Sequence, residues 1–107
     1  MTPYDPYIAY KDLTVDLRAH RVHRAGCELC LTPREFALLA VLVTHCDKAL
    51  SRSQLLEAAW GYAFIGESRT VDVHIKRLRE KLEGVSEQWS LKTVWGVGYK
   101  FEVVSGA

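Results

Sequence analysis

The stretch SRTVDVHIKRLREKLE, residues 68–83, decides the fold of this chain. A helix turns by about 100° per residue, so apolar residues three or four positions apart share one face. Four residues of the stretch follow this spacing: Val71, Ile75, Leu78 and Leu82. Ser68 can cap the first turn, and Gly84 follows the last one. We therefore predict an amphipathic helix over residues 68–83 that packs its apolar face into a core.

The opposite face of the predicted helix is polar and mostly basic. It carries Arg69, Thr70, Val73, Lys76 and Arg77, with Glu80 as the only acid at its centre. Five basic and three acidic residues lie between positions 69 and 83, although the whole chain has a net charge of only +1. The positive charge is therefore concentrated on this segment, as binding to a polyanion requires.

The side chains on this outer face are of the types that bind in a DNA groove. An arginine can bind guanine through two hydrogen bonds, and an exposed valine can pack on the methyl group of thymine. His74, Arg79 and Asp72 fall on the flanks of the helix, where side chains in a major groove would reach sideways to the phosphates. The alternative is an ordinary surface helix with solvated charges, which the spacing alone does not exclude.

Two shorter helices are predicted before this one, and each begins with a capping box. The first starts at Thr32-Pro33-Arg34-Glu35 and extends to Cys46. Its core-facing residues are Phe36, Leu39, Val43 and Cys46. The second starts at Ser51-Arg52-Ser53-Gln54 and ends at Gly61. Its apolar residues are Leu55, Leu56, Ala59 and Trp60.

Strands are predicted on both sides of the three helices. Alternating apolar residues over positions 7–31, with turns at Ala19-His20 and Ala25-Gly26, indicate a small antiparallel sheet. Its alternating runs are Leu13, Val15 and Leu17, and then Cys27, Leu29 and Leu31. Near the other end, Leu91–Trp95 and Tyr99–Val104 flank Gly96-Val97-Gly98 as a hairpin. This order indicates an α+β fold, a winged helix-turn-helix with an N-terminal antiparallel sheet.

Length and composition favour one globular domain. The chain has 107 residues, of which 49% are hydrophobic and 25% charged. We expect the domain to occupy residues 7–107 and residues 1–6 to be a linker remnant. The longest apolar run, residues 36–43, is well short of the roughly 20 residues of a membrane span. Without a signal layout at the N-terminus, a cytoplasmic protein with three reduced cysteines is expected.

Four motifs in this order resemble the effector domain of OmpR/PhoB-type response regulators. They are residues 31–36 (LTPREF), Trp60-Gly61, residues 68–75 (SRTVDVHI) and residues 96–99 (GVGY). The resemblance covers residues 13–103. It implies a four-stranded N-terminal sheet, a helix-turn-helix whose third helix enters the major groove, and a C-terminal hairpin wing, residues 91–103, at the adjacent minor groove. It also implies transcription regulation within a two-component system.

The resemblance also assigns residues to roles. Three would touch bases: Thr70, Val73 and Arg77. Seven would hold the DNA backbone: Trp60, Arg69, His74, Lys76, Arg79, Thr93 and Tyr99. The apolar loop with Tyr62, Phe64 and Ile65 lies where relatives contact RNA polymerase. Relatives bind direct repeats in promoter DNA as head-to-tail dimers, and no cofactor is implied.

The chain departs from the family pattern at the wing tip, where Trp95 stands in place of the usual minor-groove arginine. An indole carries no charge. We therefore predict that Trp95 packs on the sugar-phosphate edge and that Lys92 or Lys100 supplies the charge. The alternative is that Trp95 covers the hydrophobic face of the wing itself.

A typical relative also has a phosphorylatable receiver domain upstream. Pro3 and Pro6 suit the end of a linker from one. We expect an excised effector domain, although a natural stand-alone protein is the alternative.

Three other classes of function are considered. A metal or dithiol site could use His20, His23, Cys27 and Cys30, but residues three apart on a strand point to opposite faces, so a tetrahedral site is not favoured. No phosphate-binding glycine loop or paired nucleophile and base suggests an enzyme. A winged helix that binds protein instead of DNA remains an alternative, although the basic helix face favours DNA.

Overall fold

The computed structural model describes residues 7–10, 12–61, 69–82 and 89–103. Three sequence predictions therefore fall outside the described residues. They are the linker remnant at residues 1–6, the loop with Tyr62, Phe64 and Ile65, and the two ends of the 68–83 helix at Ser68 and Glu83.

The N-terminal part forms the predicted antiparallel sheet. Its strands, in spatial order, are β1 Tyr7–Tyr10, β2 Leu13–Asp16, β3 Arg21–Arg24 and β4 Cys27–Leu29. The turn between β3 and β4 is Ala25-Gly26, as predicted, and both residues have positive φ, 50° and 83°, as a two-residue hairpin turn favours. The inward-facing residues are Leu13, Val15 and Val22. Cys27 is exposed, because it lies at the start of the edge strand β4.

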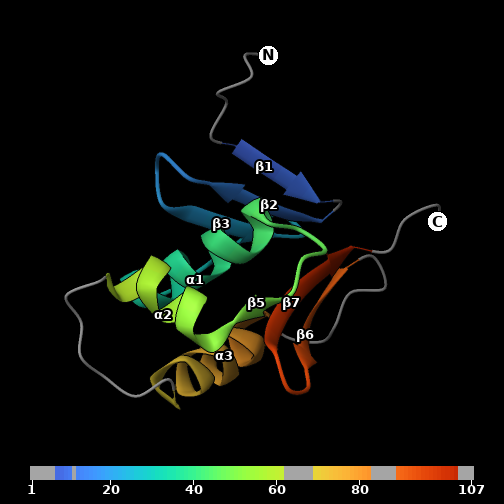
Figure 1. Ribbon diagram of the computed structural model, residues 1–107. Coiled ribbons are helices and arrows are strands. Elements are labelled where there is room, and N and C mark those ends of the chain that lie inside the picture. The colour runs from blue at the N-terminus through green and yellow to red at the C-terminus, as the bar shows by residue number, and fades with distance from the viewer. Residues whose placement is uncertain (1–6, 11, 62–68, 83–88, 104–107) are drawn as a thin grey trace.

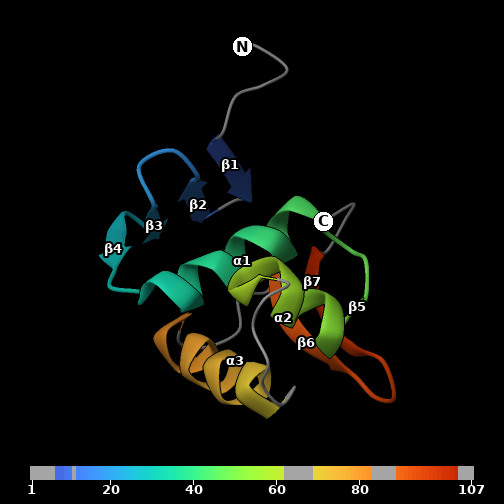
Figure 2. The ribbon, with the colours of Figure 1, turned by 60° about the vertical axis from the view of Figure 1, so that its left-hand side comes forward.

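Both predicted capping boxes are present. Helix α1, Pro33–Thr44, is capped by Thr32 and Glu35, and α2, Arg52–Trp60, by Ser51 and Gln54. Gly61 ends α2 with φ 95°, a backbone conformation that favours glycine. In Figures 1 and 2, α1 lies between the N-terminal sheet and α3, Arg69–Leu82. Its core residues are Phe36, Leu38, Leu39, Leu42 and Val43.

A second sheet contains one strand that the sequence analysis missed. Its order is β5 Leu50–Ser51, β7 Gly98–Val103 and β6 Trp89–Val94. The predicted hairpin is confirmed, but β6 begins earlier than Leu91, and Trp95 lies in the turn. Leu50 pairs with Tyr99 and Ser51 with Gly98. A Cβ atom on Gly98 would lie 2.0 Å from the carbonyl oxygen of Leu50, so only glycine permits this approach.

Candidate nucleic-acid interface

Helix α3 has the two faces that its sequence predicts. Val71, Ile75 and Leu78 are fully buried, and Leu82 is nearly so. On the other side Arg69, Lys76, Arg77 and Glu80 are exposed and Thr70 is half-buried. Val73 is 48% exposed. Within the described part of the chain, no ion pair or hydrogen bond holds the side chain of Lys76 or Arg77. These two cations are therefore available to an external anion.

Two other cations of α3 are used inside the protein. Lys81 Nζ lies 2.5 Å from Oε1 of Glu35, which is 1% exposed. Burial alone would raise the pKa of Glu35, but hydrogen bonds from Lys81 and from the Thr32 amide outweigh it and hold that pKa below its ordinary value. Glu35 thus serves both the capping box and an ion pair that fastens the end of α3 to α1. Only the capping role of Glu35 follows from the local sequence.

Arg79 joins α3 to the β6–β7 hairpin, which we call the wing, residues 89–103. Its Nε donates to the Leu91 carbonyl at 3.1 Å, and its Nη2 donates to Oγ1 of Thr93 at 2.7 Å. The guanidinium carbon lies 5.4 Å from the ring centroid of Tyr99. Three residues predicted to hold the DNA backbone are thus brought together, and they bind one another.

Asp72 makes a second connection between α3 and its neighbours. Its Oδ1 accepts a hydrogen bond from the Tyr99 hydroxyl at 2.5 Å and one from Arg52 Nε at 2.9 Å. Burial raises the pKa of Tyr99, and the hydrogen bond and charge of Asp72 raise it further, whereas Arg52 opposes the shift. Arg52 was not singled out from the sequence, because a cation inside a capping box looks like an ordinary surface residue.

Trp60 and His74 lie side by side where α2 meets α3. Their ring centroids are 4.9 Å apart in an edge-to-face arrangement, and the Arg34 guanidinium lies 5.3 Å from the Trp60 ring. His74 Nδ1 is 2.8 Å from the Thr70 carbonyl oxygen. A carbonyl only accepts, so Nδ1 carries a hydrogen, and Nε2 donates to a phosphate only in the charged imidazolium. Arg34 is a further neighbour that sequence reasoning missed.

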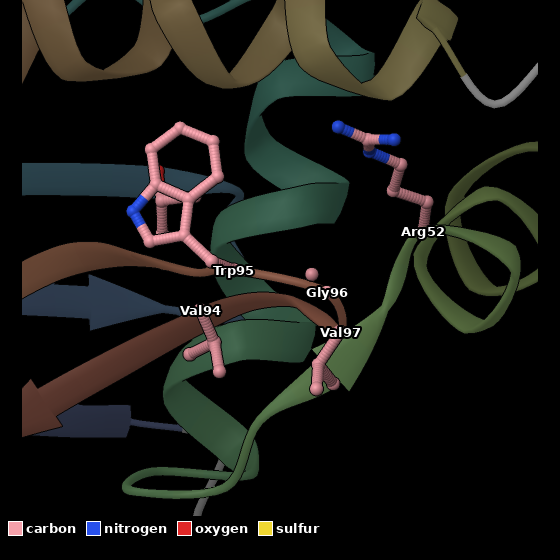
Figure 3. Close-up of a pocket in the computed structure, with 7 residues that line it drawn as sticks. Arg52, Val94, Trp95, Gly96 and Val97 are labelled. Carbon is pink, nitrogen blue, oxygen red and sulfur yellow. The ribbon is translucent and has the colours of Figure 1, made fainter.

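The tip of the wing exposes the indole of Trp95. Trp95 is 89% exposed, and Figure 3 shows it projecting toward α3 while Val94 points the other way. The alternative that Trp95 covers the hydrophobic face of the wing is therefore wrong. The turn is closed by a hydrogen bond from the Val97 amide to the Val94 carbonyl, 3.0 Å.

Lys92 and Lys100 stand opposite each other in the wing, two residue pairs below its turn. Each ammonium lies 2.9 Å from a carboxylate oxygen of Glu102. These two hydrogen bonds lower the pKa of Glu102 to about 2, and the bond from Lys100 has the larger effect. The charge that we expected one of these lysines to supply beside Trp95 is thus shared with a carboxylate.

The residues of the alternative metal or dithiol site, His20, His23, Cys27 and Cys30, lie apart from this interface. His20 stacks on Phe36 with ring centroids 4.7 Å apart, and Cys27 and Cys30 are exposed free thiols. The described ranges contain no group of three or more potential metal-ligating side chains. They also contain no helix with the length and apolarity needed to cross a bilayer.

Helix α3 has a basic outer face, follows the short helix α2 and packs against the β6–β7 hairpin. This arrangement defines a winged-helix domain of the DNA-binding class. The family described as "Transcriptional regulatory protein, C terminal" matches residues 26–101, more than half of the chain. The chain therefore belongs to this family, with regulators of the OmpR/PhoB type as its homologues. The family comprises transcription regulators and is not a family of enzymes.

Curated relatives and solved structures agree with this assignment. The chain is 50% identical over 104 residues to the transcriptional regulatory protein ResD of Bacillus subtilis, which covers 95% of this chain and 43% of ResD. It is 51% identical over 100 residues to SrrA of Staphylococcus aureus, covering 92% and 42%. The chain thus spans less than half the length of these relatives. The Klebsiella pneumoniae RstA DNA-binding domain, solved in complex with the RstA box, has a TM-score of 0.78 and 35% identity over 90% of this chain and 96% of that one.

Proposed function

We propose that this domain regulates transcription by inserting α3 into the major groove of promoter DNA and placing the wing at the adjacent minor groove. The observation that carries the proposal is the outer face of α3, where Lys76 and Arg77 are exposed beside the exposed Val73 and form no ion pair with the described residues. On a merely solvated face Val73 would gain nothing, whereas in a groove it can meet a thymine methyl group. The similarity to an RstA domain solved with its DNA box supports this interpretation.

The proposed contacts fall into two groups. By the resemblance to the family, Thr70, Val73 and Arg77 face the base edges, and Val73 and Arg77 are exposed on the side of α3 opposite its buried residues. Arg69 and Lys76 of the same exposed side hold phosphates, together with His74 and the neighbouring Trp60 of α2. Arg79, Thr93 and Tyr99 contribute by setting the angle between α3 and the wing, since their polar atoms already bind one another or Asp72.

The partners of the whole protein are also proposed from its relatives. We propose, from the resemblance to OmpR/PhoB-type regulators, that a receiver domain precedes this domain in the full-length regulator; the chain covers only 43% of ResD and 42% of SrrA. Two copies of the protein bind direct repeats of promoter DNA head to tail. RNA polymerase contacts the loop with Tyr62, Phe64 and Ile65. The protein works in the cytoplasm, where promoter DNA is found.

Selection from a random duplex library, followed by a salt titration of the winning site, tests the proposal. We expect a repeated half-site and an affinity that falls steeply as salt rises. Arg77→Ala is expected to lose about 1–3 kcal/mol and to relax the preference at one base pair, whereas Lys76→Ala weakens all sequences equally. Arg18→Ala, on the exposed β2–β3 turn, is the matched control that leaves affinity unchanged.

The contrary result would contradict the proposal. If no sequence is enriched and Arg77→Ala leaves a weak affinity for DNA unchanged, the domain does not read DNA directly. The winged helix would then be a protein-interaction module, as the alternative holds.

A further inference from the structure

Glu80 is the one acidic residue on the exposed side of α3 among the described residues, and the proposed DNA contacts give it no role. It lies seven residues after Val73, so the two side chains share one face of the helix, about two turns apart. It also lies three residues after Arg77, about 4.5 Å further along the helix axis. All three side chains are exposed. Glu80 therefore lies on the face that is proposed to enter the major groove, one turn beyond the last residue that reads a base.

The carboxylate of Glu80 makes no polar contact inside the described part of the protein. No hydrogen bond or ion pair joins it to a described residue, although Lys76 and Arg77 lie one turn before it. A basic residue that precedes an acidic one is the weaker order for such pairs on a helix. The other acid of α3 in the described residues, Asp72, is instead bound by α2 and by the wing. The Glu80 carboxylate therefore keeps its full capacity to accept hydrogen bonds from an external donor.

We propose that Glu80 reads a cytosine in the major groove and adds this preference to those of the other residues of α3. The inference rests on the proposed docking of α3 in that groove. An ionised carboxylate only accepts hydrogen bonds and phosphates offer no donor, so its partners in the groove are the exocyclic amines of cytosine and adenine. The adenine amine lies between two acceptors, its own N7 and O4 of thymine, whereas the cytosine amine has only O6 of guanine beside it. Cytosine is thus the base that repels the carboxylate least.

The surroundings of Glu80 allow its carboxylate to approach DNA and make the approach selective. Lys76 and Arg77 are exposed on the same side of α3, and their charges offset the repulsion between the carboxylate and nearby phosphates. Where no amine is within reach, the carboxylate loses water without gaining a hydrogen bond, which weakens binding. Specificity of this kind comes mainly from weaker binding of the wrong sequences. Removal of the carboxylate is therefore expected to raise the affinity for many sequences and to abolish the preference at one position.

Selection from the random duplex library tests the inference, with wild type, Glu80→Ala, Glu80→Gln and the control Glu28→Ala. The wild type is expected to select cytosine within about three base pairs of the pair whose preference Arg77→Ala relaxes, since base pairs are spaced by about 3.4 Å. Glu80→Ala should lose that preference alone, and Glu80→Gln should shift it to adenine, whose N6 and N7 suit an amide. Glu28→Ala makes the same change of net charge on β4 of the N-terminal sheet and should leave every preference unchanged.

Anisotropy titrations measure the size of the effect with two duplexes, one with the selected cytosine and one with uracil in its place. Uracil replaces the amine by an acceptor and lacks the methyl group of thymine, so any difference reports on the amine. The wild type is expected to bind the uracil duplex about tenfold more weakly, whereas Glu80→Ala binds both duplexes alike. Thermal unfolding of each variant reports on folding separately.

If no cytosine is selected at this distance, or if Glu80→Ala leaves every base preference unchanged, the inference is overturned and the proposed function stands. Glu80 would then only repel the DNA backbone, if Glu80→Ala strengthens binding to all sequences alike, or remain in water, if the affinity does not change. If the wild type enriches no sequence at all, the proposed function fails and this inference with it.

Discussion

Trp95 is the residue at which the wing of this chain departs from the OmpR/PhoB pattern. The OmpR/PhoB pattern has an arginine at this position, and an arginine is drawn to the negative potential of a narrow minor groove. The indole is 89% exposed, so binding DNA would bury a large apolar surface that contributes without any charge. The wing of this chain is therefore expected to depend less on minor-groove electrostatics than an arginine wing.

Two substitutions test this interpretation of the wing tip. Trp95→Ala is expected to weaken binding to the selected duplex by about 1–2 kcal/mol, because alanine buries less apolar surface against the DNA than the indole ring does. Trp95→Arg should steepen the salt dependence by about 0.9 in the log–log slope and shift the preference under the wing toward A·T pairs. Fluorescence anisotropy at several salt concentrations measures both effects. An unchanged affinity for Trp95→Ala would contradict a contact by the indole.

Gly98 is a second residue whose role is decided by a single close approach. A Cβ atom there would lie 2.0 Å from the Leu50 carbonyl oxygen, and a backbone atom cannot move aside as a side chain can. We expect Gly98→Ala to destabilise the domain by about 3 kcal/mol, the upper end for overpacking. Gly96→Ala is the matched control in the same hairpin, since it has only a positive φ of 81° and should cost about 1 kcal/mol. Equal losses in urea denaturation would show that β5 does not constrain β7.

At the scale of elements, α3 is held to its neighbours near both of its ends. Asp72 in its first turn binds Arg52 of α2 and Tyr99 of the wing, and Arg79 in its last turn binds Leu91 of β6. Near its end Lys81 pairs with Glu35 of α1, and the Leu82 carbonyl accepts a hydrogen bond from Arg24 of β3. Each connection uses a residue from a side of the helix other than its outer face. The residues proposed to read bases are thereby left accessible on a rigid support.

Glu35→Gln separates the ion pair with Lys81 from the capping box, because glutamine also serves at the third position of the box. We expect a loss of about 1–2 kcal/mol at neutral pH, less than for a fully buried pair because Lys81 is 37% exposed. The pKa of Glu35 is lower in the folded protein than its ordinary value of 4.5. Its contribution is therefore fully present above pH 4.5 and is lost as the pH falls through the folded pKa.

Urea denaturation of wild type and Glu35→Gln across a pH series measures this effect. The difference in free energy of unfolding between the two proteins should shrink as the medium becomes more acidic than pH 4.5. A difference that stays constant down to the acid limit would mean that the Glu35 charge does not stabilise the fold. Lys48→Gln, an exposed lysine in the segment between α1 and β5, provides a control without a buried partner.

At the scale of the whole molecule, the N-terminal sheet and the helices form one folding unit. Leu13, Val15 and Val22 of the sheet belong to the same core as α1 and α3. Trp89 at the start of β6 donates its indole N–H to Asp12 Oδ1 at 2.7 Å, and Arg24 lies over the same ring at 5.6 Å. Because this contact joins the N-terminal sheet to the β6–β7 hairpin, we expect these two parts of the chain to unfold together.

Trp89→Phe tests this coupling while largely keeping the packing of the ring. The variant is expected to lose about 1.5–3 kcal/mol, the usual effect of deleting a hydrogen bond to a charged group. It should still unfold in one transition, with the same midpoint by circular dichroism and by fluorescence of the remaining tryptophans. Two separated midpoints would show that the sheet and the winged helix are independent units.

Local patterns were sufficient to predict the helices, the turns and the outer face of α3. Capping boxes at Thr32 and Ser51 act within four residues, and the apolar spacing from Val71 to Leu82 depends only on the helical repeat. Such features do not depend on distant parts of the chain. The four motifs on which the sequence resembles the OmpR/PhoB family are also short and local, and the family match over residues 26–101 agrees with them.

Contacts between distant segments could not be predicted in this way. The two-residue strand β5 exists because Gly98 admits Leu50, and the burial of Glu35 is stabilised by Lys81, 46 residues further along the chain. Arg52 and Trp95 line one pocket only because the wing folds back beside α2. The fold class and the basic outer face of α3 thus follow from short-range spacing in the sequence. Which cations stay available to phosphates depends on long-range packing, because tertiary neighbours decide whether a cation pairs with an internal carboxylate.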